Sequence, residues 1–335
     1  MAKRPAWKGY GNVKKIGKAI TSFEQSNLLI AVIIICVVIG SLTPVFFSGG
    51  NIMNLLRQAS MAGIAGLGMT LIMLTGEVDL SIGSAQAMIG VFVVTVINAT
   101  NSIFLGIVCG IGLGVAMGVF HATLVTKFQL ESLIVTLATL SVYRGTVMVL
   151  TSASSIPANN PNFELIGTGY VGPVPIPVIM LVALCALIYF ITRHTTFGRN
   201  LYAVGSNREA AKLAGINVSM YKYRAFIMNG MFVALAAIIL ASRINSGQPQ
   251  AGVGFELAVI SAVILGGVSL AGGRGTIAGM ILGVMILSIL DNGLVLLNVS
   301  SFYQQIVRGI VLILAVYFDQ RRKVSFQKKV LEEKQ

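Results

Sequence analysis

Charged side chains are scarce in this chain. Only 10% of its 335 residues are charged, whereas 56% are hydrophobic and the mean hydropathy is +0.86. Roughly a quarter of the residues of an ordinary soluble domain are charged. The composition therefore excludes a soluble globular protein. It predicts an all-α polytopic membrane protein, because helices satisfy their own backbone hydrogen bonds in lipid.

Motifs for catalysis, metal binding and nucleic-acid binding are missing as well. Cysteines 36, 109 and 185 each lie in an apolar run without disulfide or metal-site spacing, and His121 and His194 have no ligand partner nearby in the sequence. The net charge of +13 comes with no zinc-finger or RNA-binding motif. No P-loop, G-x-S-x-G or H-E-x-x-H pattern occurs. We therefore expect no catalytic residue, no metal site, no nucleic-acid partner and no nucleotide site in this chain.

Long apolar runs make up most of the sequence. A membrane-spanning helix needs roughly 17 to 25 residues, and all of the runs come close to this length except 257–271, which is short. The first run lacks a signal-peptide cleavage pattern, so we expect it to remain as a span. Within a transmembrane domain at 28–318 we expect about ten helices, some of them broken: 28–47, 52–75, 80–97, 103–126, 133–150, 174–192, 225–242, 257–271, 275–297 and 302–318.

Basic residues indicate how the spans are oriented. Twenty of the 24 Lys and Arg fall in the arm 1–27, the loop 193–224, the tail 319–335 and two short turns. The segment 151–173, by contrast, has none. Because cytoplasmic segments are enriched in Lys and Arg, the arm, the loop and the tail are expected in the cytoplasm, with an even number of spans. Eight spans would satisfy this pattern as well as ten.

Glycine placement predicts close packing and interrupted helices. Glycines recur every four residues from Gly106 to Gly118, which favours a close approach of two helix backbones in lipid. The stretches 72–90 and 263–283 each break an apolar run with a glycine-rich turn. This similarity fits either a duplicated transporter half with broken helices or a chance match between apolar sequences.

A few carboxylates lie within or beside the apolar runs, where a charge is costly and marks a pathway or a buried pair. They are Glu77, Asp79, Glu256 and Asp291. Asp79 is well placed to cap a half-helix from Leu80, and it can also lie in a pathway. Asp291 can be neutralised by Arg308 or Arg144. Such a pair would serve the structure or a proton relay.

The stretch 206–215 predicts a short helix in the charged loop. Ser206 and Glu209 fit a capping box, and Gly215 fits a left-handed end. A small apolar face is formed by Ala210, Leu213 and Ala214. A helix of about two turns needs something to pack against. It therefore either docks into another protein on the cytoplasmic side or lies on lipid headgroups.

Four stretches together resemble the membrane permease subunits of bacterial ABC importers for monosaccharides, of the ribose, xylose, galactose and autoinducer-2 kind. They are GEVDLSIGS at 76–84, TFGRNLYAVGSNREAAKLAGINV at 196–218, ILGGVSLAGGRGTIAGMILG at 264–283 and QQIVRGIVLILAV at 304–316. They are spread from the second expected span to the last.

The resemblance implies a complex in the bacterial inner membrane. Its expected members are a second permease subunit, identical or related, two cytoplasmic ATP-binding subunits or one fused subunit, and a periplasmic sugar-binding protein. ATP and Mg would bind to the partner subunits, so this chain would hold no cofactor and would not be an enzyme. The family's coupling helix maps onto Arg208, Glu209, Ala210, Ala211 and Gly215. The sequence departs from the broader importer signature farther along, because Ala225 and Phe226 stand near the place where many importers have an Ile followed by Leu-Pro.

A neutral sugar needs a mildly polar route, and the candidate route residues are Asp79, Ser81, Ser84, Gln86, Asn229 and Ser261. Serine within spans also packs helices without contacting substrate. Two other functions stay open at this point. An ion-coupled secondary transporter would use a carboxylate such as Asp79 or Asp291 and would need no docking helix. A membrane scaffold would move no solute at all.

Overall fold

The computed structural model describes residues 9–332, with side chains from 26 to 317 and from 319 to 321. Helices dominate, which confirms the all-α expectation. The α-helices are α1 (Gly9–Leu42), α2 (Gly49–Leu74), α3 (Ile82–Thr100), α4 (Ile103–Thr126), α5 (Ser132–Thr151), α6 (Leu165–Thr168), α7 (Ile176–His194), α8 (Thr196–Ser206), α9 (Arg208–Leu213), α10 (Val218–Arg243), α11 (Phe255–Leu265), α12 (Ile277–Leu296) and α13 (Ser301–Glu332). Two 3-10 helices are η1 (Pro44–Phe47) and η2 (Pro161–Glu164).

Among the residues that the structure describes, fewer helices of membrane length occur than the ten expected. Within the described residues, eight helices are long and apolar enough to cross a membrane. Two apolar helices are shorter: the part Ser26–Leu42 of α1, whose side chains are described, and α11, Phe255–Leu265. The expected count of ten is therefore not confirmed. The span expected at 257–271 is wrong as a full crossing, because α11 ends at Leu265 and the chain turns at Gly267, where φ is +88°.

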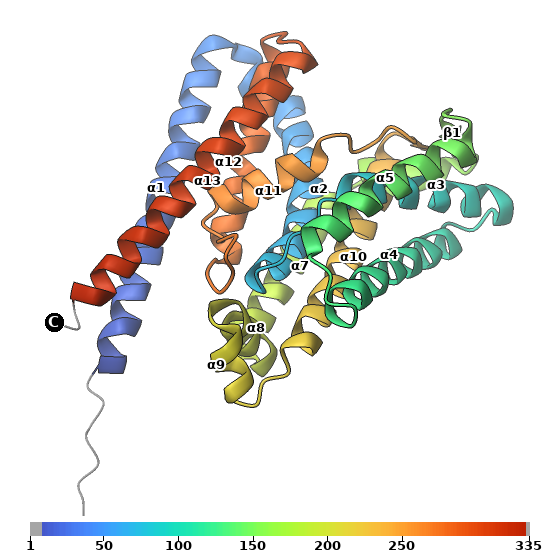
Figure 1. Ribbon diagram of the computed structural model, residues 1–335. Helices are drawn as coiled ribbons and strands as arrows, with labels where there is room; N and C mark the ends of the chain where they lie inside the picture. The colour runs from blue at the N-terminus through green and yellow to red at the C-terminus, as the bar shows by residue number, and fades with distance from the viewer. Residues whose placement is uncertain (1–8, 333–335) are drawn as a thin grey trace, which may run out of the picture.

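Helix α10 lies at the centre of the bundle, packed against α2, α3 and α4. On one side α12 packs against α1, α2 and α11, and Figure 1 shows α1, α12 and α13 together on that side. The expected glycine contact is confirmed between α4 and α10. A Cβ at Gly114 would overlap the carbonyl oxygen of Gly230, and a Cβ at Gly230 would overlap that of Gly114. These two helices therefore meet backbone to backbone.

Two helical breaks meet at one end of the bundle. The stretch 75–81 separates α2 from α3, and the turn 266–276 separates α11 from α12. The N–H of Gly273 donates to the carbonyl of Leu74 at 3.0 Å, and a Cβ at Gly272 would stand 2.8 Å from Gly76 N. The two glycine-rich turns noted in the sequence are thus in direct contact. Helices α8 and α9 lie at the same end (Figure 1).

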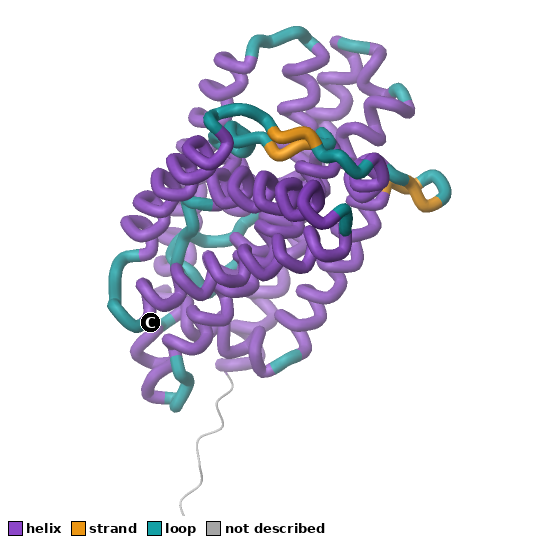
Figure 2. The backbone as a smooth tube through the Cα atoms, turned by 90° about the vertical axis from the view of Figure 1, so that its right-hand side faces the viewer, coloured by secondary structure: helices purple, strands orange, loops and turns teal. Residues whose placement is uncertain are grey.

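The few strands lie away from that end, as the label of β1 in Figure 1 shows. β1 (Ile156–Pro157) pairs antiparallel with β4 (Ser246–Gly247), and β2 (Tyr170–Val171) pairs with β3 (Val174–Pro175). Figure 2 shows both pairs as short segments among the helices. The β1–β4 pair ties the segment after α5 to the segment after α10.

Candidate functional site: an exposed short helix and a buried polar cluster

The short helix expected at 206–215 is present as α9, but its N-terminal cap differs from the expectation. Asn207 is the N-cap, and its side-chain oxygen accepts from the N–H of Ala210 at 2.9 Å. Ser206 is the last residue of α8, and its hydroxyl donates to Tyr202 O at 2.8 Å. The capping box of Ser206 with Glu209 is therefore wrong, because Asn207 caps equally well. The left-handed end at Gly215 is confirmed, with φ of +77°.

The apolar face of α9 is not covered by the chain. Ala210 and Ala214 are exposed, and Leu213 is 90% exposed, whereas Ala211 is buried. A helix of six residues does not hold itself together in water. Its attachment to α8 and the burial of Ala211 position it. The face formed by Ala210, Leu213 and Ala214 remains free to contact something outside this chain.

An ion-pair group connects α9 to the bundle. Nη2 of Arg208 lies 2.7 Å from Oε1 of Glu77, and Nζ of Lys222 in α10 contacts the same oxygen. Glu77 is only 5% exposed, whereas the side chain of Arg208 is half-exposed. A buried carboxylate needs such partners, since an unpaired charge is expensive to bury. The sequence identified Glu77 as membrane-associated and left its partners open.

Helix α8 packs against both helical breaks. A Cβ at Gly205 would overlap the carbonyl of Leu74, and the hydroxyl of Tyr202 donates to Gly275 O at 2.9 Å. Burial raises the pKa of the Tyr202 hydroxyl, against a smaller opposite effect of the Arg193 charge. The hydroxyl therefore stays protonated as a donor at neutral pH.

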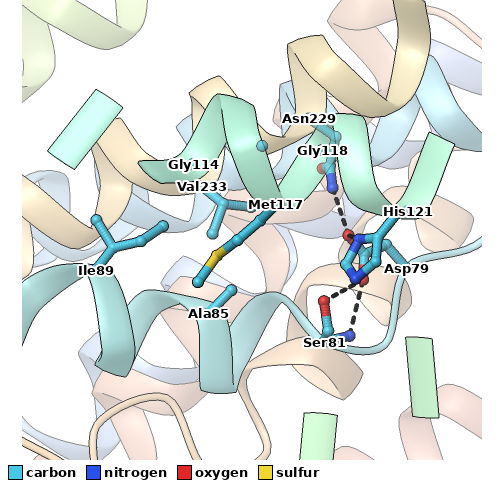
Figure 3. A pocket seen from close by; sticks show the side chains of 11 residues that line it. Asp79, Ser81, Ala85, Ile89, Gly114, Met117, Gly118, His121, Asn229 and Val233 are labelled. Carbon is cyan, nitrogen blue, oxygen red and sulfur yellow. Dashed lines mark hydrogen bonds and ion pairs between the residues drawn. The ribbon is translucent and has the colours of Figure 1, made fainter. Parts of the chain in front are cut away.

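Asp79 is the centre of a polar cluster inside the bundle, shown in Figure 3. Its Oδ1 accepts from the N–H of Ser81 at 2.8 Å and from the hydroxyl of Ser81 at 2.7 Å. Its Oδ2 accepts from Nδ2 of Asn229 at 2.7 Å and lies 3.6 Å from Nδ1 of His121. Helix α3 starts at Ile82 with Ser81 as its N-cap, so Asp79 lies two residues before the N-cap position, although its carboxylate accepts from the backbone N–H of Ser81 at the start of the helix. Its carboxylate instead joins the start of α3 to α4 and α10.

His121 extends the cluster to α5. Its Nε2 lies 2.9 Å from the hydroxyl oxygen of Thr139 and 3.2 Å from that of Tyr143. The sequence pattern gave His121 no metal-ligand partner, and it did not identify these hydrogen-bond partners. The partners of His121 come from distant segments of the chain, so no spacing signal could have identified them. Within the part of the chain that the structure describes, no group of three His, Cys, Asp or Glu could hold a metal.

The structure brings some of the six route candidates together and separates others. Asp79, Ser81 and Asn229 line one small cavity of about 10 Å³. The hydroxyls of Ser84 and Ser261 donate to carbonyls of the preceding turn, Ser81 O and Leu257 O, and neither side chain lines that cavity. Buried Gln86 does not line it either. A volume of this size holds about one water. It is too small for a monosaccharide.

The other carboxylates near the membrane have separate partners. Arg308 donates to both oxygens of Asp291, at 3.1 and 3.0 Å, which settles the choice between Arg308 and Arg144. Arg144 donates to the carbonyl of Pro249 instead. The Asp291–Arg308 pair joins α12 to α13 and does not touch α9.

In the part of the chain that the structure describes, eight membrane-length helices, two helical breaks that meet at one end and a buried polar cluster define a polytopic membrane protein. The chain belongs to the family described as branched-chain amino acid transport system / permease component, whose family model matches residues 51–316. No solved structure matches the chain.

Several characterised relatives align with almost the whole chain. The ribose import permease protein RbsC of Bacillus subtilis is 40% identical over 301 residues, which cover 89% of this chain and 94% of the relative. RbsC of Escherichia coli K12 is 38% identical over 306 residues, covering 90% and 94%. The L-arabinose ABC transporter permease protein AraH of Azospirillum brasilense is 38% identical over 300 residues, covering 90% and 88%.

Proposed function

We propose that this chain is the membrane-spanning permease subunit of an ATP-driven importer for a monosaccharide, with ribose and arabinose as the first sugars to test. The observation that carries the proposal is the identity of 38 to 40% to ribose and L-arabinose permeases along about nine tenths of the chain. The ion-coupled alternative is not favoured. The protein is a transport subunit and not an enzyme. Branched-chain amino acids remain the comparison substrate, because the family description names them.

The partners that we propose follow from the missing nucleotide motif and the free face of α9. Two ATP-binding subunits, or one fused subunit, would dock on this face and would hold ATP and Mg. A second permease copy would complete the route, and a periplasmic sugar-binding protein would deliver the sugar. The exposed side chain of Leu213 supports docking of α9 against another protein. A helix of about two turns is marginally stable in water, and burial of its apolar face would stabilise it. The inner membrane is the proposed location, with both termini and 193–224 cytoplasmic.

The proposed mechanism is alternating access driven from outside the chain. ATP binding would bring the ATP-binding subunits together and move α9, with contacts at Arg208, Glu209, Ala210 and Gly215. Ala211, the fifth residue expected in the coupling helix, is buried and would instead hold α9 to the bundle. The helices would then rock between two states, and each state must bind the partners differently for coupling to occur. The small cavity beside Asp79 supports a closed route in this conformation. The six candidate side chains stay proposed route residues, with Asp79, Ser81 and Asn229 first among them.

Stimulated ATP hydrolysis tests the substrate. The chain is reconstituted with its ATP-binding and sugar-binding partners, and hydrolysis is measured with ribose, L-arabinose or leucine. We expect a pentose to stimulate hydrolysis and leucine to have no effect. Stimulation by leucine alone would assign the chain to amino acid import, and hydrolysis that no solute changes would favour a scaffold.

A further inference from the structure

The link between α9 and the interior of the bundle is narrow. Among the hydrogen bonds and ion pairs of the described side chains, Arg208 is the only side chain of α9 that bonds to the membrane-embedded helices and the stretches between them. It reaches Oε1 of Glu77 at 2.7 Å and Gly76 O at 3.5 Å. Both acceptors lie in the stretch 75–81. A displacement of α9 therefore acts on this stretch through Arg208, besides acting on α8 and α10, which α9 also contacts.

The stretch 75–81 is in turn tied to α10 at two places. Lys222 contacts Glu77, and Asn229, two helical turns farther along α10, donates to Asp79 at 2.7 Å. Residues seven apart lie on the same face of a helix, so one face of α10 holds both carboxylates. Through Asp79 the stretch also holds the first turn of α3 and lies beside His121 of α4. The stretch thus connects α9 to the polar cluster.

The Glu77 side chain is buried, which strengthens its ion pairs relative to those of a surface carboxylate. Its side chain is 6% exposed and that of Lys222 is 13% exposed, so water screens their attraction little. The Glu77–Arg208 pair is shielded from water on the side of the carboxylate only. The half-exposed guanidinium of Arg208 is the part of the Glu77–Arg208 pair that belongs to α9, the helix proposed to dock on the ATP-binding subunits.

We propose that Glu77 is a positioning residue for coupling: its ion pair with Arg208 transmits movement of α9 to the stretch 75–81 and so to the polar cluster around Asp79. The inference rests on the proposed function, in which α9 is moved by ATP-binding subunits. Lys222 of α10 holds the Glu77 carboxylate in place. The bond between Asn229 and Asp79 is a second contact between α10 and the stretch 75–81, so α10 stays attached to this stretch when Lys222 is replaced.

The test compares uptake per ATP hydrolysed in proteoliposomes that contain the permease, its ATP-binding subunits and the sugar-binding protein, with ribose and L-arabinose as probes. The main variant is the double substitution Glu77→Gln, Lys222→Met, which removes one charge of each sign. Its matched control, Lys222→Met, keeps the Glu77–Arg208 pair. A second control, Asp291→Asn, breaks an ion pair that does not touch α9.

We expect the double variant to bind the ATP-binding subunits normally and to lose about tenfold in sugar moved per ATP, within the usual range of coupling energies. Both controls should keep most of the wild-type ratio. A purely structural role would lower uptake and hydrolysis in proportion, and an unchanged ratio would overturn the inference. Loss of subunit binding would overturn it too, because Glu77 would then serve docking.

If the double variant does not fold, Arg208→Gln decides, since this side chain is half-exposed and its replacement leaves the core unchanged. Binding of the ATP-binding subunits is measured in the same samples and must stay normal, because Arg208 is also a proposed docking contact. It should lower the ratio to the same extent, and a wild-type ratio would refute the link. A wild-type complex in which neither sugar stimulates hydrolysis would instead refute the proposed function. The two failures are therefore distinguishable.

Discussion

Two substitutions at Asp79 distinguish the contributions of its two carboxylate oxygens to stability, because Oδ1 binds Ser81 and Oδ2 binds Asn229. In Asp79→Ala, the N–H of Ser81 and Nδ2 of Asn229 both lose their acceptor inside the bundle. Each orphaned buried donor costs roughly 1 to 3 kcal/mol, so we expect about 3 kcal/mol of lost stability. In Asp79→Asn, one oxygen can still accept from Ser81, and the new amide can donate to Oδ1 of a flipped Asn229. That oxygen has no partner at present. We therefore expect about 1 kcal/mol for this substitution.

The assay is reversible unfolding in mixed micelles, followed by circular dichroism, with Ser84→Ala as the control. Among the described residues, the buried hydroxyl of Ser84 bonds to the carbonyl of Ser81 one turn earlier, and the loss of this single bond should cost about 1 kcal/mol. Equal destabilisation by Asp79→Ala and Asp79→Asn would refute the assignment of the Asn229 bond. A cost for Asp79→Ala no larger than that of the control would refute the cluster as a stabilising feature.

Further substitutions test packing, docking and the second ion pair. Gly114→Leu should cost at least about 2 kcal/mol by forcing α4 from α10, whereas Gly112→Leu, which faces open space, should cost little in the same unfolding assay. Leu213→Asp should weaken co-purification with the ATP-binding subunits about tenfold and leave the thermal midpoint unchanged. Arg308→Leu should cost about 3 kcal/mol by leaving Asp291 unpaired, and adding Asp291→Leu should recover most of it; a further loss would contradict the pairing.

Periodicity and composition predicted those features of the fold that depend on neighbours in the sequence. Apolar runs located the helices, glycine at four-residue spacing located the contact at Gly114, and Gly215 marked the end of α9. The N-cap was misplaced by one residue because Ser206 and Asn207 are both good caps. The run 257–271 was short and contained Gly266 and Gly267, where α11 ends, but apolar residues continue to Ala271 and led to its being expected as a span.

The polar cluster could be predicted only in part. Asp79, Ser81 and Asn229 were candidates by residue type, but the bond between Asp79 and Asn229 joins positions 150 apart, and such pairing leaves no local pattern. His121 was passed over for the same reason. The partner of Asp291 was narrowed to two arginines, and packing of α13 against the bundle selects Arg308. Tertiary contacts therefore supplied what local sequence could not.

In the proposed function, this chain moves a sugar only with energy delivered from other subunits. Uptake of radiolabelled ribose or L-arabinose into proteoliposomes measures this directly, first with the chain alone under a proton or sodium gradient and then with ATP-binding subunits, sugar-binding protein and ATP. We expect uptake in the complete system and none from the chain alone. Gradient-driven uptake by the isolated chain would contradict this expectation.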